Sequence, residues 1–299
     1  MAGSSRGTGE AWRFEAIGTR WEVVTARALG KSERAEVGRL IERFDAEWSR
    51  FRPDSTVSLL ATDGGSRPAP GDAALLLDAY VELSAATAGA VNPLVGESLV
   101  RLGYDSSYSL TPGEAVAAPA DWTRRLSWDD GALRLDGPGV IDVGALGKGR
   151  LVDLVLDLVI AMAPGDVVVD AGGDLAVRGE PQRVGLEHPF DPRRVVGVWE
   201  VTDAALCASG ITRRAWGDGL HHVLDARTGA PVRTVAATWA VAADAMRADA
   251  VATALFFDGG PRIAFDWHVE WVRMTTDGRV EWSPGCSAEL FTRPASVGS

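Results

Sequence analysis

The feature that most limits how this chain can fold is a glycine-rich turn at residues 144–149, which reads GALGKG. It follows an apolar stretch that we expect to be a strand. It opens the segment LVDLVLDLVIAMA, whose apolar spacing predicts a helix that ends before Pro164. Lys148, within this turn, is one of only two lysines among 30 basic residues. A strand, a tight turn and a helix therefore meet beside a rare lysine.

Two interpretations of this turn remain open from its residues alone. The first turn of a helix exposes unpaired N–H groups, and glycine lets an anion approach them closely, so the turn and Lys148 suit a phosphate. The alternative is a tight turn whose lysine is merely solvated. The P-loop pattern does not apply, because Gly149 rather than Ser or Thr follows Lys148, and G-x-G-x-x-G is not matched either.

The composition excludes several classes of protein. A formal net charge of −11 argues against a general nucleic-acid binder, because phosphate backbones are held by clustered Lys and Arg. Two cysteines, Cys207 and Cys286, form neither a disulfide framework nor the spacing of a zinc site. No stretch resembles a signal peptide or reaches the ~18 apolar residues of a membrane span. We expect a cytoplasmic protein without direct membrane insertion.

The order of strand-rich and helical stretches predicts an α+β fold in one domain. We expect loops at residues 49–61, a disordered leader at 1–10, a folded domain at 11–290 and a flexible tail at 291–299. The helices are expected at residues 32–48, 72–89, 147–163 and 242–257, with strands at 20–28 and on both sides of the glycines in 166–179.

The predicted helix at 242–257 carries a candidate metal site. Asp249 and Thr253 are four residues apart and share one face of that helix. A carboxylate, a hydroxyl and a nearby backbone carbonyl are the hard oxygen ligands that Mg²⁺ prefers. The simpler interpretation, favoured when this helix is taken alone, is a hydrogen-bonded aspartate on a closely packed helix face.

Two further stretches are open to a functional interpretation. His222 lies three residues before Asp225, and an imidazole beside a carboxylate can act as a general base. A partly buried histidine bonded to Asp225 explains the same residues equally well. Asp170 and Asp174 flank two glycines, which predicts a turn whose aspartates bond the local backbone, with a pocket wall as the alternative.

Eight stretches in a fixed order carry a resemblance that no single motif does. They read IGTRWEV, WSRFRPDSTVSLL, TAGAVNPLVGESLVRLGYD, DVGALGKGRLVD, VVDAGGDLAVRG, ASGITRRAW, HHVLDARTGAPV and ADAVATALF. In this order they resemble the FAD:protein FMN transferase family, ApbE, from about Ile17 to about Phe257.

The resemblance implies one ApbE-like α+β domain with mixed or antiparallel sheets and several flanking helices. It implies an enzyme that binds FAD and Mg²⁺, transfers the FMN moiety to a threonine or serine hydroxyl of a target protein, and releases AMP. The alternatives are an FAD pyrophosphatase that yields FMN and AMP, and a non-catalytic flavin-binding protein. The chain lacks an acceptor motif of the form Asp-Gly-x-Ser/Thr-Gly-Ala-Ser/Thr, so we expect the acceptor to be a separate protein.

The resemblance also assigns roles to residues. Departures from the common family pattern occur at Ile17, Phe51 and Asn92, where Met, Tyr and Asp are frequent, and at Ala226, where Pro is usual. The implied metal ligands are Asp249, Thr253 and the carbonyls of Ala145 and Ala252; the implied base is His222, oriented by Asp225; the implied flavin-nucleotide contacts are Asp142 and Lys148, with further FAD contacts at Ile17, Phe51, Ala90, Val91, Asn92 and Val223.

Overall fold

The structure, a computed structural model, describes residues 9–212, 215–217 and 219–291. Most of the expected leader and tail, residues 1–8 and 292–299, lies outside these ranges. The first strand already begins at Glu10.

The helices and strands of the described residues are as follows. The helices are α1 Lys31–Trp48, α2 Thr56–Ala61, α3 Ala73–Ala86, α4 Gly96–Arg101, α5 Trp122–Arg125, α6 Gly147–Met162, α7 Ala245–Ala254 and α8 Gly260–Asp266. The strands are β1 Glu10–Ala16, β2 Thr19–Thr25, β3 Gly65–Pro68, β4 Leu126–Ser127, β5 Ala132–Leu135, β6 Val167–Asp170, β7 Asp174–Arg178, β8 Gln182–Glu187, β9 Val195–Val201, β10 Ala205–Gly210, β11 Ala215–Trp216, β12 Leu220–His221, β13 Leu224–Asp225, β14 Ala230–Pro231, β15 Val235–Ala242, β16 Glu270–Thr275, β17 Val280–Trp282 and β18 Glu289–Leu290.

One eight-stranded sheet organises the molecule, in the order β1-β2-β6-β7-β10-β15-β16-β17. Every neighbouring pair in it is antiparallel. Smaller antiparallel sheets are formed by β18-β9-β8 and by β3-β5-β4, and two ribbons by β11-β12 and β13-β14. These antiparallel sheets with flanking helices confirm the predicted α+β class.

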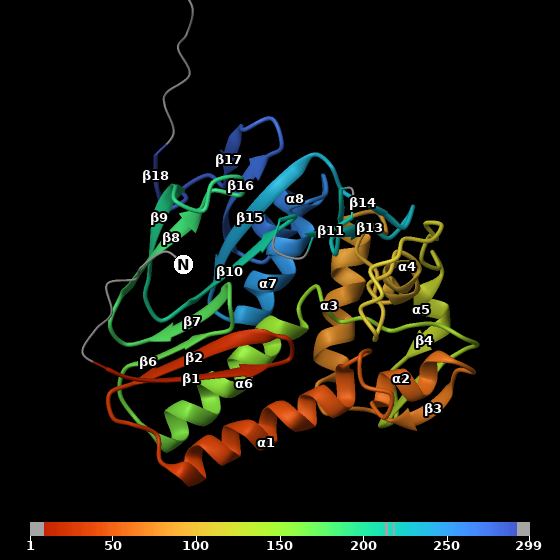
Figure 1. The fold of residues 1–299 in the computed structure, drawn as a ribbon, viewed down its shortest axis with the longest axis horizontal. Helices are drawn as coiled ribbons and strands as arrows, with labels where there is room; N and C mark the ends of the chain where they lie inside the picture. The colour runs from red at the N-terminus through yellow and green to blue at the C-terminus, as the bar shows by residue number, and fades with distance from the viewer. Residues whose placement is uncertain (1–8, 213–214, 218, 292–299) are drawn as a thin grey trace, which may run out of the picture.

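The two faces of the main sheet are covered differently, as Figure 1 shows. Helices α6 and α7 pack on one face, and α1 packs on α6 from outside. Val167 and Val169 of β6 belong to the core on this helical side. The small sheet β18-β9-β8 packs on the other face, where Leu186 of β8 and Leu206 of β10 share a second core. Alternate residues of each strand thus serve two separate cores.

Two local expectations were wrong. No strand leads into the turn at 144–149, because β5 ends at Leu135 and Gly137-Pro138-Gly139 follows; the N–H of Asp142 donates to the carbonyl of Pro93 instead. Residues 49–61, expected as loop, contain helix α2, whose N-cap Ser55 accepts a hydrogen bond from the N–H of Ser58. This cap is a start signal that the short segment offered in its sequence.

In the described part of the chain, no helix combines the length and the apolar character that crossing a bilayer requires.

Candidate functional site

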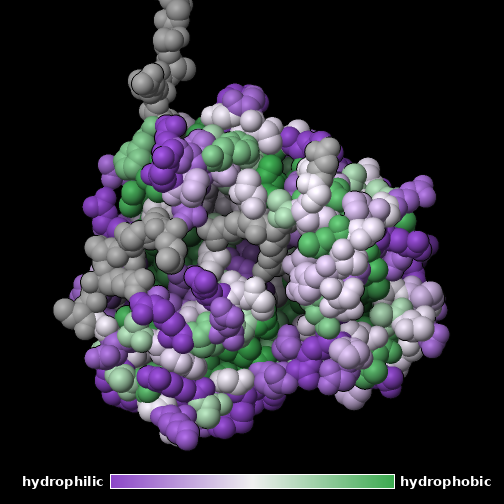
Figure 2. Space-filling model, in the orientation of Figure 1, coloured by the Kyte–Doolittle hydropathy of each residue, from purple (hydrophilic) through white to green (hydrophobic). Residues whose placement is uncertain are grey.

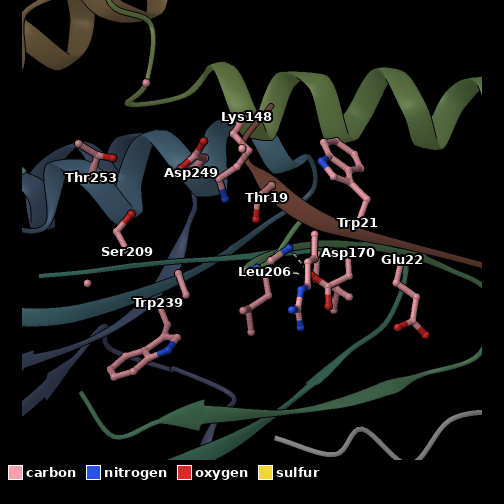
Figure 3. Close-up of a pocket in the computed structure, with 18 of the residues that line it drawn as sticks. Thr19, Trp21, Glu22, Lys148, Asp170, Leu206, Ser209, Trp239, Asp249 and Thr253 are labelled. Carbon is pink, nitrogen blue, oxygen red and sulfur yellow. Dashed lines mark hydrogen bonds between the residues drawn. The ribbon is translucent and has the colours of Figure 1, made fainter. Parts of the chain in front are cut away.

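A cavity of about 1640 Å³ reaches both faces of the main sheet. Lys148, Asp249 and Thr253, from the helical side, line it together with Leu206 and Trp239, from the opposite face (Figure 3). The cavity therefore passes around the ends of β6 and β7, where the Gly172-Gly173 turn also lines it. Figure 2 shows the surface hollowed near the centre of this view.

Helices α6 and α7 approach each other closely beside the cavity at Gly149. The N–H of Gly149 donates to a carboxylate oxygen of Asp249 at 2.9 Å. A Cβ at position 149 would lie 2.2 Å from the carbonyl oxygen of Ala245 and 2.8 Å from Cβ of Asp249. Only glycine permits this approach. Asp249, which is 100 residues beyond Gly149 in the sequence, is thereby fixed against the first turn of α6.

The turn before α6 is tied to α7 and to α3. The Thr253 hydroxyl donates to the Ala145 carbonyl at 3.2 Å. The Tyr80 hydroxyl donates to the Asp142 carbonyl at 3.0 Å and accepts from the N–H of Ala145 at 3.3 Å. Three of the four predicted oxygen ligands, from Ala145, Asp249 and Thr253, therefore lie at one corner of the cavity.

Lys148 has a partner that the sequence left open. Its ammonium pairs with the carboxylate of Asp174, which is fully buried on β7. Burial alone lowers the pKa of Lys148, but the charges of Asp174 and Asp249 outweigh it, so the pKa lies above its usual value. The lysine is held as a cation, and a turn with a merely solvated lysine is the interpretation that the structure does not support.

Asp170 and Asp174, which flank the two glycines, have different roles in the structure. The carboxylate of Asp170 accepts from the N–H of Gly172 at 2.8 Å, as expected for a turn, and also lines the cavity. Burial raises the pKa of Asp170. Asp174 turns to the helical side and serves Lys148. Two features of the sequence could have suggested this ion pair. Asp174 comes directly after two glycines, and Lys148 is one of only two lysines in the chain.

Asp142 is held from two sides beside an aromatic group. Nε of Arg50 donates to its carboxylate at 2.5 Å, and the N–H of Gly144 donates at 2.7 Å. The Arg50 side chain is only 4% exposed, and its guanidinium carbon lies 4.1 Å from the ring centre of Phe51. The Phe51 ring, which lines the cavity, stacks on Tyr108. Phe51 is thus held at the cavity wall by contacts with both Arg50 and Tyr108.

Four of the five remaining predicted FAD contacts lie at the cavity. Ala90, Val91, Asn92 and Val223 line the cavity. The Asn92 amide also braces its own loop, since it donates to the Pro119 carbonyl and accepts from the N–H of Leu94, both at 2.9 Å.

Ile17, expected as an FAD contact, and Ala252, expected to offer its carbonyl to the metal, are not among the described residues that line the cavity. Ile17 occupies the β1–β2 turn with a φ of 43°, a strained value for a β-branched residue, and contributes to a separate smaller pocket. Its neighbour Gly18 is the residue of this turn that reaches the cavity. The carbonyl of Ala252 accepts from the Thr238 hydroxyl at 2.6 Å and so faces the sheet.

The two adjacent histidines have different surroundings. His222 lines the cavity. His221 is buried, its Nε2 bonds the Val232 carbonyl at 2.9 Å, and burial lowers its pKa. The carboxylate of Asp225, which we expected to orient His222, accepts with both of its oxygens from the Arg227 guanidinium, and this lowers the pKa of Asp225.

No group of three or more His, Cys, Asp or Glu side chains close enough to hold a metal occurs within the described ranges. The corner at α6 and α7 offers a different donor set, with one carboxylate, one hydroxyl and one backbone carbonyl. Such a set fits Mg²⁺, which commonly takes one or two carboxylates and completes its shell with water and phosphate oxygens. The residues present are therefore compatible with the ion.

Comparison with known proteins agrees with this arrangement. The sequence matches the ApbE family over residues 17–267, most of the chain. The chain belongs to the ApbE family.

Named relatives support the assignment. A FAD:protein FMN transferase of Rhodobacter capsulatus is 29% identical over 303 residues, which cover 93% of this chain but 57% of the relative. This chain thus spans little more than half of that relative's length. A FAD:protein FMN transferase of Vibrio cholerae is 28% identical over 253 residues, 79% of this chain and 76% of the relative.

Solved ApbE structures have the same fold. The apo form of the Pseudomonas stutzeri flavinyl transferase ApbE superposes with a TM-score of 0.76 at 23% identity, covering 92% of this chain and 95% of that one. The flavin transferase ApbE of Vibrio cholerae gives the same TM-score at 22% identity, covering 92% and 97%. The antiparallel sheets and helices described above are therefore the ApbE fold.

Proposed function

We propose that this protein transfers the FMN moiety of FAD to a threonine or serine hydroxyl of a separate acceptor protein, with release of AMP. The bond that forms joins the hydroxyl oxygen to the phosphorus of the FMN half, and the bond that breaks joins that phosphorus to the oxygen bridging to AMP. The FAD:protein FMN transferase relatives and the chemistry of the cavity support this reaction.

Lys148 and the first turn of α6 are suited to hold the diphosphate. The pair with Asp174 keeps the ammonium charged and aimed into the cavity, and the helix N-terminus adds N–H donors. A lysine ammonium is compact enough for a turn in which glycines bring two backbones together, whereas the fork of arginine is broader. We propose Asp142 and Phe51 as neighbours of the flavin nucleotide at the same wall.

Asp249, Thr253 and the Ala145 carbonyl would hold Mg²⁺. When bound, the ion supplies positive charge that neutralises the diphosphate and stabilises the charge developing on it. Ala252 is left out of this set, because its carbonyl faces β15. In the protein alone, the Gly149 and Thr253 hydrogen bonds keep these oxygens together.

His222 is proposed as the base that takes the proton of the acceptor hydroxyl. It lines the cavity, whereas His221 is turned to the backbone of Val232. A positioned base typically contributes ~10²–10⁴-fold in rate. Arg227 engages Asp225, so we propose that Asp225 orders the loop after His222 rather than orienting the imidazole itself.

The observation that carries the proposal is the convergence on one cavity of Ala145 and Lys148, from the turn before α6 and its first residues, with Asp249 and Thr253 of α7. The test is incubation with FAD, Mg²⁺ and a synthetic peptide that carries Asp-Gly-x-Thr-Gly-Ala-Thr, analysed by mass spectrometry. A peptide with added FMN, and AMP released in equal amount, is expected. Release of AMP and FMN without any modified peptide would instead identify an FAD pyrophosphatase. Binding without turnover would identify a flavin-binding protein.

A further inference from the structure

The cavity is larger than one small-molecule substrate requires. Pockets for a single such ligand are commonly about 300–1,000 Å³, whereas this cavity has about 1640 Å³. Its helical end contains the diphosphate-binding residues proposed above, and the part beyond the Gly172-Gly173 turn has no role in that proposal. A second occupant can therefore enter the same cavity from the sheet side.

The floor of this second part is one face of the main sheet. It is formed by alternate residues of neighbouring strands, which places them on the same face. The floor residues are Arg20, Glu22 and Val24 of β2, Val168 and Asp170 of β6, Leu175 of β7, and Leu206 and Ala208 of β10. The glycine turn at the end of β6 lines the same cavity as this floor and as Lys148 and Asp249.

The wall of this part is the edge of a β-strand. In the described part of the chain, β8 pairs with β9 on one side and with no strand on the other. Gln182, Arg183, Val184, Gly185 and Glu187 all line the cavity, while Leu186 is buried in the core. Successive side chains of a strand point to opposite faces. A cavity that touches almost every residue of β8 must therefore run along its edge, where main-chain groups face outward.

The charged residues that line the cavity beyond the Gly172-Gly173 turn indicate what kind of segment could bind there. Among the described residues, the lining of this part contains the acids Glu15, Glu22, Asp166, Asp170, Glu180 and Glu187, against the bases Arg13, Arg20 and Arg183. The guanidinium of Arg13 pairs with Glu22 at 3.0 Å, and that of Arg183 pairs with Glu289 at 3.4 Å. Acids therefore outnumber bases among the described lining residues, which favours a segment carrying Lys or Arg.

We propose that the acceptor protein presents its hydroxyl on an extended segment that pairs with the edge of β8, with basic residues flanking the hydroxyl. The segment lies over the floor of β2, β6 and β7, and its hydroxyl reaches the helical end past Gly172 and Gly173. Main-chain hydrogen bonds to a sheet edge provide affinity with little demand on sequence, and floor contacts with alternate side chains add selectivity. The inference rests on the proposed transferase function.

Prolines at adjacent positions of β8 test the main-chain pairing. Successive N–H groups of a strand point alternately to its two sides, so of Arg183→Pro and Val184→Pro one removes a donor facing β9 and the other a donor facing the cavity. We expect the cavity-facing proline to raise the KM for the acceptor peptide about tenfold with an unchanged KM for FAD. The other proline should mainly lower the melting temperature. Equal peptide KM values in both variants and the unmodified protein would overturn the proposal.

Peptides of different charge test the proposal without changing the protein. Two peptides with the same Asp-Gly-x-Thr-Gly-Ala-Thr centre receive either lysine or glutamate flanks. The lysine-flanked peptide should have a KM about tenfold lower at low salt, with the difference shrinking at high salt. Equal KM values would count against the acidic groove.

Two further outcomes are decisive. FMN transfer with no selective effect of flanks or prolines removes the docking site and leaves the proposed function intact, whereas no transfer to either peptide removes both. A synthetic peptide of residues 1–8 that competes as strongly as an unreactive acceptor peptide would assign the β8 edge to this chain's own first residues and overturn the proposal.

Discussion

The two walls beside the proposed reaction centre are built by different means. At the α6–α7 corner, Gly149 bonds Asp249 at 2.9 Å and Thr253 bonds Ala145 at 3.2 Å, across 100 and 108 residues of chain. Around His222, the ribbons β11 to β14 contain two residues each, and Asp225 bonds Arg227 only two residues away. Long-range packing therefore fixes the oxygen donors, while local turns position the proposed base. We expect mutations at the first wall to affect binding and stability, and those at the second to affect turnover.

The largest effect is expected at the α6–α7 corner. Asp249→Ala removes the one carboxylate of the donor set, so the rise in melting temperature caused by FAD with Mg²⁺ should be mostly lost, together with FMN transfer. Thermal denaturation with and without both ligands measures the change. Asp258→Ala, at an exposed aspartate just after α7, is the matched control. A full ligand-induced rise in the Asp249→Ala variant would rule out this metal assignment.

The second wall should show the opposite pattern. His222→Ala is expected to lower kcat by ~10²–10⁴-fold with little change in KM for FAD or in melting temperature. His221→Ala removes a buried side chain bonded to Val232 and should lower the melting temperature instead. Asp225→Asn should have a smaller effect on kcat than His222→Ala, because Arg227 takes its carboxylate. An equal loss of kcat at Asp225 would restore its role in orienting the base.

The Lys148–Asp174 pair tests whether binding and stability can be separated. Asp174→Asn leaves a largely buried ammonium without its main partner and should destabilise the fold by about 3–5 kcal/mol, measured by urea unfolding. The double variant Lys148→Met with Asp174→Leu should recover much of that stability, because no uncompensated charge remains.

The same double variant should not recover affinity for FAD. Its diphosphate cation is gone even though the fold is restored. Fluorescence titration with FAD measures the affinity at a temperature where both proteins are folded. If the double variant bound FAD as tightly as the unmodified protein, Lys148 would have only a structural role.

Local sequence signals predicted much of the fold and the members of the site. The apolar spacing of α1, α6 and α7 identified those helices to within a few residues. The four-residue spacing of Asp249 and Thr253 placed both on one face of α7, and both reach the cavity. Signals of this kind lie within one or two helical turns, so a sequence displays them directly.

What could not be predicted depends on contacts between distant segments. Asp174 pairs with Lys148 only because β7 packs against α6, and no local pattern records that. Tyr80 bonds the turn at Asp142 across 62 residues. Asp225 was predicted to orient His222, three residues before it. Its carboxylate accepts a hydrogen bond from Arg227, which is only two residues away. Proximity in sequence was informative within a helix and misleading between loops.

The smallest effect expected concerns how α7 is held, and it depends on pH. The carboxylate of Asp153 accepts from the N–H groups of Ala245 and Met246, at 2.7 and 2.9 Å, and so caps α7 from α6. Burial raises the pKa of Asp153 to about 6 despite these two bonds. Since the folded pKa exceeds that of an unfolded aspartate, the folded state retains this proton over a range in which the unfolded state has lost it.

The stabilising contribution of that proton is therefore complete below about pH 4 and is lost as the pH rises through about 6. Asp153→Asn removes this titration, so its free energy of unfolding, relative to the unmodified protein, should rise between pH 4 and 6.5 by at most about 1.4 kcal/mol per pH unit. Urea unfolding at several pH values measures the difference. Asp157→Asn, at an exposed aspartate one turn further along α6, controls for the change of charge alone. Parallel curves for the Asp153→Asn variant and the unmodified protein would mean that the first turn of α7 is held without this proton.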